Sequence, residues 1–459
     1  MNITRLLAQN VVATAGKALS EDVHVMAQDT LLNVLATAVG ASRDQAVEVT
    51  VDFASRYGGS GTVPIPGLGL WLDPLRAATA IGLAAHLDDF DDTHLATVIH
   101  PGAAQLGAAL AVGVPTGVSG RRLLTAFTLG CEVQLRVGVA MSPWHYDQGW
   151  HITGTTAAIG AAVTAVLLTD AAPDVEVMER AITLAANMGL GNRESFGSML
   201  KSFHPGKGAA NGVLAAALAA RKVCGPSDML GRPGGYFSVL SPRHEPQLLN
   251  EDFGHDWELL NNTFKPYPCG IVCHPAIDAA IALAPSLHDQ LQDVEAVTVH
   301  CHPLVQELTG DPMPTTGLQA KFSTIHGVAA GLCDGQVALA QYADDRVVAA
   351  DVRRLRSLTR LVVEADRARD SAKIDVTLTG QRVVSEDVQH ARGSLARPLT
   401  RVELHDKVTR LIDPVLPHLS SVIIAKVMSL SEAHDLEPLV EAVTGASGRR
   451  GAERVSVKA

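Results

Sequence analysis

Aromatic side chains are scarce in this chain of 459 residues, because Phe, Trp and Tyr together make up only 4% of it. A core built mainly from large rings is therefore excluded. Hydrophobic residues still reach 47%, with 40 glycines and abundant alanine. This composition predicts helices that approach one another closely through small side chains. The length exceeds what one hydrophobic core usually serves, so we expect two domains.

Positive charge is also in short supply. The net charge is −11, and the chain has ten lysines, with none between Lys17 and Lys201. Nucleic acids and anionic membranes require a broad basic surface, so neither is expected as a partner. A small anionic substrate needs only a local positive site. Lys201, Lys207 and Lys265, which lie near histidines, therefore stand out.

Cysteine is sparse, with six residues and no dense framework, which is typical of a reducing compartment. Cys269 and Cys273 are four apart without a second pair, so we expect buried thiols and no zinc site there. The first twenty residues lack the apolar core of a secretory signal, and no segment predicts a membrane span. A cytoplasmic location is the expectation.

The hydrophobic pattern predicts a mainly α protein with an inserted α+β part. Helical periodicity covers 28–41, 74–87, 103–113, 121–139, 155–168 and 176–190, and strand signals are absent before about residue 230. Alternating β-branched residues begin at 294, 358 and 372, with helices at 270–284 and 322–333 among them. After residue 402 the pattern is helical again. We therefore predict a helical domain from 1–262 and 403–459, interrupted by an α+β domain at 263–402.

The segment HLDDFDDTHLATVIHPGAAQ, at 86–105, places four aspartates beside apolar helices. Buried charge is costly unless it is paired, so this segment predicts a pocket or a solvated loop. If it is helical, Asp89 and Thr93 share one face, and His100 follows after a turn. A carboxylate near a histidine can orient the imidazole or act as a base. The other three aspartates are expected to cap helices or to pair with arginines.

Three histidines, His100, His151 and His204, precede Ala/Gly-rich stretches in the same way. Free N–H groups at helix N-termini attract anions, and a histidine just upstream adds a donor or a proton carrier. If such ends converge near Lys201, they form a site for carboxylates. The remaining histidines near these segments, His86, His94 and His145, are interpreted mainly as structural.

DDFDD also matches DDxxD, a carboxylate cluster that holds Mg²⁺ in helical prenyl-transfer and terpene-cyclising enzymes. Such enzymes need a second metal motif on a facing helix and usually an aromatic pocket. Asp344 and Asp345 lack the required spacing, and aromatic residues are few. We therefore expect no metal.

Six motifs in order resemble the 2-methylcitrate dehydratase family, also called MmgE/PrpD. They are DFDDTH…HPGAAQLGAALA, GWHITGTTAAIGAAVTA, LKSFHPGKGAANGVLAAALAA, CGP…LGRPGG, FKPYPCGIVCHPAIDAA and AKFSTIHGVAAGLCDG. The resemblance covers nearly the whole chain. It implies a large helical domain built from both chain ends, a smaller α+β lid, a homodimer, and an active site between the domains without a metal or organic cofactor.

The family includes 2-methylcitrate dehydratases, cis-aconitate decarboxylases and a dicarboxylate epimerase, which implies a small polycarboxylate as substrate. Carried over motif by motif, the implied site comprises Asp89, Thr93, His100, His151, Lys201 and Lys265. Where the family commonly has tyrosine, this chain has His326 in STIHGVAAGLCDG. Imidazole titrates near neutral pH and can serve as acid or base, unlike a phenol.

The expected mechanism begins with the loss of a proton α to a carboxylate. Lys201 and Lys265 would hold the substrate carboxylates and His151 or His100 would take the proton, with Asp89 as orienting group and His326 as acid. Loss of hydroxide gives a dehydratase, which we rank first. Loss of CO₂ or reprotonation from the other face gives a decarboxylase or an epimerase. A binding protein that holds the anion without turnover is the alternative from another class.

Overall fold

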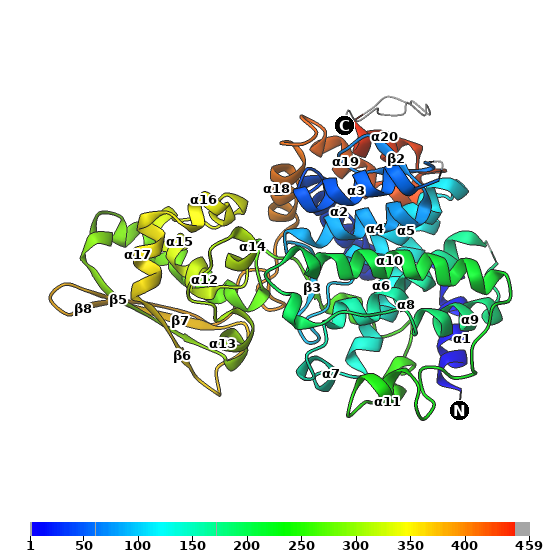
Figure 1. Cartoon of the computed structure of the whole chain (residues 1–459), viewed down its shortest axis with the longest axis horizontal. Helices are drawn as coiled ribbons and strands as arrows, with labels where there is room; N and C mark the ends of the chain where they lie inside the picture. Colours follow the sequence, from blue (N-terminus) through cyan, green and yellow to red (C-terminus); the bar gives the residue numbers. More distant parts are fainter. Residues whose placement is uncertain (1, 60, 171, 446–459) are drawn as a thin grey trace.

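The structure is a computed structural model that describes residues 2–445 except 60 and 171. The chain is mainly α-helical. A larger helical body occupies one side of the molecule, and a smaller body with a four-stranded sheet lies beside it (Figure 1). Each body has its own large cluster of buried apolar side chains.

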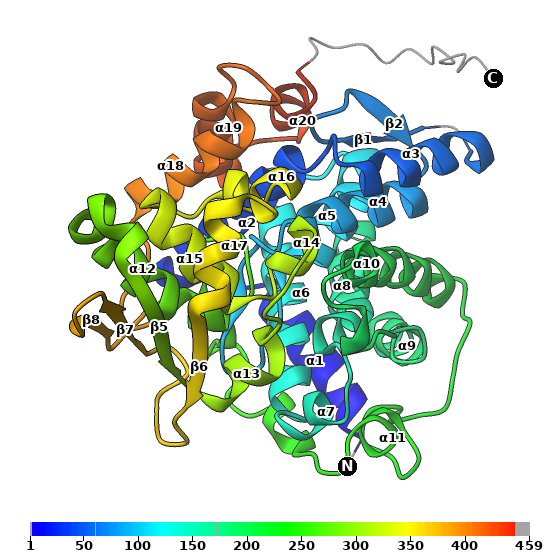
Figure 2. The same cartoon turned by 60° about the vertical axis from the view of Figure 1, so that its left-hand side comes forward.

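The larger body is built from both parts of the chain that flank the sheet. Its N-terminal helices are α1 (Ile3–Ala15), α2 (Glu21–Gly40), α3 (Gln45–Tyr57), α4 (Pro74–Leu87), α5 (Gly102–Thr116), α6 (Gly120–Val139), α8 (Ile152–Thr169), α9 (Val175–Ala185) and α10 (Met199–Ala220). The C-terminal helices α18 (Arg401–Ile412), α19 (Ser420–Met428) and α20 (Glu437–Thr444) complete it (Figure 2). Local signals fit these bounds, since the Asp73 side chain caps α4 and Pro74 opens it.

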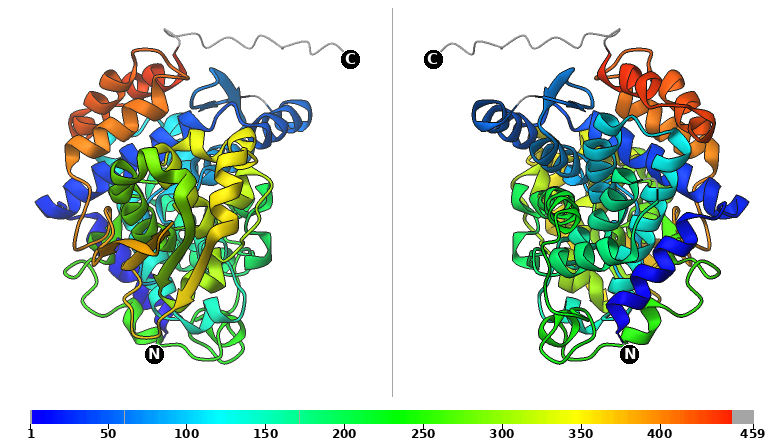
Figure 3. Two further views of the ribbon diagram at one scale, coloured as in Figure 1. Left: turned by 90° about the vertical axis from the view of Figure 1, so that its left-hand side faces the viewer. Right: turned by 90° about the vertical axis from the view of Figure 1, so that its right-hand side faces the viewer.

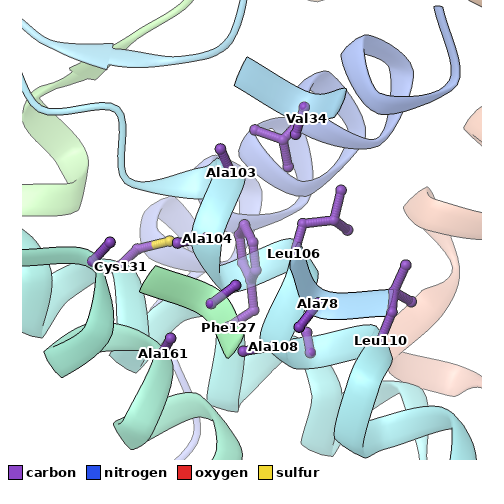
Figure 4. Close-up of a cluster of buried hydrophobic side chains, with 14 of the residues drawn as sticks. Val34, Ala78, Ala103, Ala104, Leu106, Ala108, Leu110, Phe127, Cys131 and Ala161 are labelled. Atoms are coloured by element: carbon purple, nitrogen blue, oxygen red, sulfur yellow. The ribbon is translucent and has the colours of Figure 1, made fainter. Parts of the chain in front are cut away.

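Small residues let these helices pack closely. A Cβ atom added to Gly82 of α4 would lie 2.9 Å from Gly206 Cα of α10, and one added to Gly160 of α8 would lie 2.5 Å from Gly130 O of α6. Around Phe127 the core is filled largely by alanine, leucine and valine (Figure 4). This packing explains how the larger body does without many aromatic rings.

The larger body is not purely helical, so the prediction of no strand before residue 230 was wrong. It holds two short antiparallel strand pairs, β1 (Val63–Ile65) with β2 (Leu70–Leu72) and β3 (Thr93–His94) with β4 (Asn262–Thr263). Strands of two or three residues are too short to produce an alternating pattern. The turn between β1 and β2 uses Gly67 and Gly69 at positive φ.

The smaller body contains the sheet in the order β6-β5-β7-β8. Its strands are β5 (Val294–Cys301), β6 (Thr359–Val363), β7 (Ala372–Leu378) and β8 (Arg382–Val388), and only the β5–β6 pair is parallel. The helices α12 (His274–Leu287), α15 (Thr324–Asp334) and α17 (Ala350–Leu358) cover one face (Figures 1 and 3). The three predicted strand regions therefore form this sheet, and the third folds into the β7–β8 hairpin.

The C-terminal helices rejoin the first part of the chain. Gln28 of α2 donates a hydrogen bond to the Met428 carbonyl at 2.7 Å, and Lys407 of α18 donates to Asn33 Oδ1 at 2.7 Å. The apolar residues of both parts belong to one cluster. Residues 446–459 of the predicted C-terminal part lie outside the described residues.

Two stretches of the described chain are long and apolar enough to cross a membrane, namely Ile152–Thr169 and Ile271–Asp293. Within the protein, 94% of the first and 61% of the second are buried. Packing inside the protein therefore accounts for their apolar composition.

Candidate active site

The acidic segment forms an irregular turn between α4 and β3. Helix α4 ends at Leu87, and Asp89 has a left-handed backbone with φ 51°. Thr93 then pairs with Thr263 in the β3–β4 ladder, which brings Lys265 next to the turn. Asp89 and Thr93 thus share no helical face. Aspartate tolerates the left-handed region better than most residues, and such strain is common at functional sites.

Four buried lysines from separate parts of the chain converge on this turn. Lys201 comes from α10, Lys265 follows β4, Lys321 follows α14 (Gly317–Ala320), and Lys407 comes from α18. Their ammonium groups contact the side chain of Asp88 or Asp89, or backbone carbonyls of residues 88–90. Four of the ten lysines of the chain therefore surround residues 88–90, where the two bodies meet.

Asp89 Oδ1 lies 2.7 Å from Lys201 Nζ and 3.2 Å from Lys265 Nζ. Burial raises the pKa of Asp89, but the two ammonium groups outweigh this effect and hold the pKa well below its usual value. Burial lowers the pKa of Lys201 despite its aspartate partner. Asp89 is therefore an ionised anchor for both lysines.

The two lysines differ in how their N–H groups are used. Lys265 Nζ has three acceptors within 3.2 Å, namely Asp89 Oδ1, Asp89 O and Cys269 O. Lys201 Nζ contacts Asp89 and, at 2.9 Å, His86 Nε2. An ammonium group has three protons to donate. Among the described residues, Lys201 thus keeps one N–H without a hydrogen-bond acceptor, beside the rings of Phe196 and Phe322 at 5.4 Å each.

Asp91 joins two histidines. Its Oδ2 lies 2.7 Å from His86 Nδ1, and its Oδ1 lies 3.0 Å from His100 Nδ1. Burial raises the pKa of Asp91, but these imidazoles outweigh it and keep the carboxylate ionised. Burial lowers the pKa of His100 to about 3. Asp91 therefore lies closer to His100 than Asp89, the carboxylate that the sequence favoured, which is 3.7 Å from His100 Nε2.

The other predicted residues lie around these two carboxylates. Thr93 Oγ1 is 3.2 Å from His100 Nδ1. His151 stacks on His86 with ring centroids 5.7 Å apart, and His151 Nδ1 lies 2.9 Å from His204 Nδ1. Burial, together with nearby Lys201, lowers the pKa of His151 well below its usual value. Asp89, Thr93, His100, His151, Lys201 and Lys265 thus form one buried group.

The helix ends follow the predicted pattern only in part. His151 is the N-cap residue of α8, and His100 lies just before α5. However, α10 begins at Met199, so His204 lies in its second turn, with Pro205 inside the helix. At α5 the N-terminus is already occupied, since Gly102 N donates to Asp92 Oδ2 at 3.2 Å. Of these three histidines, His151 alone lies at a helix N-terminus that no carboxylate of the described residues caps.

Asp92 is a buried capping residue with an unusual titration. Besides Gly102 N, it accepts a hydrogen bond from Asn262 Nδ2 at 2.7 Å. Burial, with the neighbouring Asp91 carboxylate, raises the pKa of Asp92 to about 7. The capping role expected for this aspartate is confirmed.

His326 is not part of the buried group. It lies in α15 of the smaller body, where its Nε2 is 2.9 Å from the Gln341 carbonyl and its ring faces Tyr342. Burial lowers its pKa to about 4. The resemblance predicted the position of His326 in the motif but not the direction of its ring. In the structure the ring faces the 3-10 helix η6 (Leu339–Tyr342). The predicted role of His326 as acid therefore has no support from the geometry.

Comparison with protein families identifies the chain. The MmgE/PrpD N-terminal domain matches residues 5–249, and the MmgE/PrpD C-terminal domain matches residues 267–431. The chain belongs to the MmgE/PrpD family. No curated protein matches it. MmgE/PrpD proteins are generally lyases, dehydratases among them.

The donor set of this MmgE/PrpD protein could be taken for a metal site. His86, Asp89, Asp91 and His100 offer ligand atoms within 4.8 Å of one another. However, Lys201 donates to His86 Nε2, so His86 Nδ1 carries the proton that it donates to Asp91. Lys201 and Lys265 also place two positive charges at Asp89 Oδ1. The ligand atoms are thus used by protons and ammonium groups, and the site does not fit a divalent cation.

Several residues of the MmgE/PrpD site escaped the sequence analysis. His86 and Asp91 were assigned structural roles, yet both lie at the centre of the hydrogen-bond network. Their position in HLDDFDD, five residues apart across a helix end, was the available signal. Phe196 and Phe322, whose rings are 5.3 Å apart, come one from each body and had no signal in the sequence. His94 and His145 make their hydrogen bonds to other groups, namely Thr97 for the first and Leu240 O and Thr155 for the second, and their structural role stays a prediction.

Proposed function

We propose that this protein is a lyase that acts on a small polycarboxylate without a metal or organic cofactor, and that it removes a proton α to a carboxylate. A 2-methylcitrate dehydratase-like reaction is the first candidate. The observation that carries the proposal is the buried ammonium of Lys201, which among the described residues keeps one N–H without an acceptor, beside Phe196 and Phe322. A buried positive donor of this kind stabilises negative charge as it develops on a substrate.

Lys201 binds a substrate carboxylate in this proposal, while Lys265 acts through Asp89. The support is their hydrogen bonding, since Lys265 has three protein acceptors and Lys201 has two. Lys265 holds Asp89 ionised and in place. Burial of the Lys201 ammonium also strengthens its attraction for a substrate carboxylate, because little water screens the two charges.

His151 is the proposed base, with His100 and Thr93 beside it. Among the described residues, the hydrogen bond of His151 is made through Nδ1, which leaves Nε2 for the substrate. Burial and Lys201 depress the pKa of His151 in the absence of an anion. The carboxylates of a bound substrate counter this effect and restore basicity when the substrate is present.

We also propose that the smaller body acts as a lid. Two contacts across the boundary support this role, the Lys321–Asp88 ion pair at 2.8 Å and the Phe196–Phe322 ring pair. The site residues are almost fully buried, so a substrate requires these contacts to open.

The location and the oligomeric state of the protein are also proposals. We propose a cytoplasmic homodimer, and free cysteines support a reducing compartment. The apolar face of α3, with Val49, Phe53 and Tyr57 at least 59% exposed, is the candidate for a subunit interface. Sedimentation of the wild type and of Phe53→Lys tests it, and an unchanged dimer in the variant would exclude this face.

The function is tested by incubating purified protein with 2-methylcitrate, citrate, cis-aconitate and small iminodiacids in D₂O. Alkene absorbance, CO₂ release and deuterium uptake are followed in parallel. Alkene formation supports the dehydratase, CO₂ release the decarboxylase, and deuterium uptake without net product the epimerase. Binding without any of the three signals would support the non-catalytic alternative and overturn the proposed lyase.

A further inference from the structure

We infer that His204 is a proton relay that connects His151 to solvent. The inference rests on the proposed function, in which His151 takes a proton from substrate. His151 is the N-cap of α8, and His204 lies in α10, the helix beside it (Figure 2). Their Nδ1 atoms are 2.9 Å apart, so one of the two rings donates a proton to the other.

The two imidazoles differ in their access to water. His151 is 2% exposed, whereas His204 is only partly buried. Among the described residues, the hydrogen bonds of His204 involve Nδ1 alone. His204 Nε2 therefore remains for exchange with water, and the pair forms a path from the buried site toward the surface.

Two glycines hold the His204 ring in this position. A Cβ atom at Gly191 would lie 2.7 Å from His204 Nδ1, and one at Gly154 would lie 2.8 Å from His204 Cβ. The carbonyl of Gly191 also accepts a hydrogen bond from His151 N at 3.0 Å. The same short segment thus positions the backbone of one histidine and makes room for the ring of the other.

The relay moves one proton at each step. His151 Nε2 accepts the substrate proton, and the electrons of the C–H bond remain on the substrate carbon. His151 then passes its Nδ1 proton to His204 Nδ1, and His204 releases its Nε2 proton to water. Both rings are again neutral, as the opposite tautomers. Flow in the reverse direction resets them and delivers the His151 Nε2 proton to the leaving hydroxide or to carbon.

Positive and neutral groups surround the pair and favour passing the proton outward. His151 is faced by His86, His100 and Lys201, and His204 by His86 and Lys201. Burial and these neighbours lower the pKa of His204 to about 4. A protonated His204 therefore loses its proton readily to water or buffer.

The test uses His204→Gln in the full chain, with Lys207→Gln as the matched control, because Lys207 is exposed on the same helix. With a substrate deuterated at the α carbon, we expect a loss of roughly 10²-fold in kcat, the low end for a positioned acid or base. The KM should stay nearly unchanged. Release of deuterium to solvent should fall likewise, and added imidazole should restore both. Equal activity of His204→Gln and Lys207→Gln, or a loss that imidazole does not restore, would overturn the relay.

Nitrogen-15 spectra of the histidine rings separate this inference from the proposed function. The relay requires a protonated Nδ1 shared between His151 and His204, which His204→Gln abolishes. If no substrate is turned over but this shared proton is observed, the proposed function has failed while the hydrogen-bonded path stands. If the spectra show no Nδ1 proton shared by the two rings, the relay is wrong whatever the reaction.

Discussion

The Lys201 ammonium lies 2.7 Å from Asp89 Oδ1, and neither side chain is more than 5% exposed. One partner comes from the turn after α4 and the other from the first turn of α10, 112 residues along the chain. The ion pair therefore fixes two distant segments at the boundary between the larger and the smaller body.

Replacing the Lys201 ammonium is expected to lower activity strongly. Lys201→Met removes the donor for a substrate carboxylate and leaves Asp89 with Lys265 as its remaining lysine partner. We expect kcat/KM to fall by roughly 10²–10³-fold, the cost of losing one preorganised donor to a developing charge. Breaking a buried pair also costs about 3–5 kcal/mol of stability. Steady-state kinetics and urea unfolding measure the two effects. Lys207→Met is the control, and a variant that keeps near wild-type rates would contradict the assignment.

Asp91→Asn tests the orientation of His100 and His86. The amide keeps the size of the carboxylate but loses the charge that both imidazoles face. We expect kcat to fall by about 10²–10⁴-fold, the usual contribution of a positioned acid or base, with a smaller change in KM. Asp147→Asn, an exposed substitution on α7 (Trp144–Asp147), should leave the rate unchanged. A similar kcat for the two variants would show that the contacts of Asp91 with His86 and His100 do not matter for the reaction.

Asp92 makes stability depend on pH. Its pKa is raised from 3.8 to about 7, so the folded state binds a proton that the unfolded state has lost between these values. This stabilisation is complete below pH 3.8 and disappears as the pH rises through 7. At about 1.4 kcal/mol per pKa unit, the full effect is on the order of 4 kcal/mol. The wild type should therefore lose stability as the pH rises from 5 to 8, and Asp92→Asn should lose less of it. Urea unfolding at both values measures this, and a pH-independent difference would refute the assigned shift.

The close packing of α4 on α10 predicts a sensitive glycine. Gly82→Ala would place a Cβ atom 2.9 Å from Gly206 Cα and 3.2 Å from the Pro205 carbonyl, neither of which can move alone. We expect a loss of about 1–3 kcal/mol, as for other overpacked cores. Gly16→Ala is the control, since its nearest atom, Ala13 O, is 3.8 Å away. Thermal unfolding compares the two, and equal stability would show that the helices can separate.

The sequence predicted the helices and strands that have long periodic patterns. Helix α4, predicted at 74–87, has the same bounds in the structure, and the β-rich stretches near 294, 358 and 372 form the sheet. Short elements escaped because two or three residues carry no period, as β3 and β4 illustrate. The start of helix α10 was predicted wrongly. Proline is common at the first position of a helix, so Pro205 after His204 suggested a helix start there, but the helix begins at Met199.

The sequence predicted residues that gather at the candidate site, but it did not predict all the contacts between them. Motifs identified Asp89 and Lys201, but the choice of Asp91 over Asp89 as the partner of His100 depends on the left-handed turn at Asp89. Such a turn has no signature in residue spacing. His326 shows the opposite error, since a motif position does not say which way a side chain faces once α15 has packed.

The glycine contacts between α4 and α10 also bear on redesign of the candidate site. Lys201 and His204 sit on α10, less than two turns from Gly206, which packs against α4. Enlarging Gly82 or Gly206 would therefore shift Lys201 and His204 together, so neither group could be repositioned alone in this way. Phe196 and Phe322, which are only partly buried and lie outside that seam, are the positions to vary first.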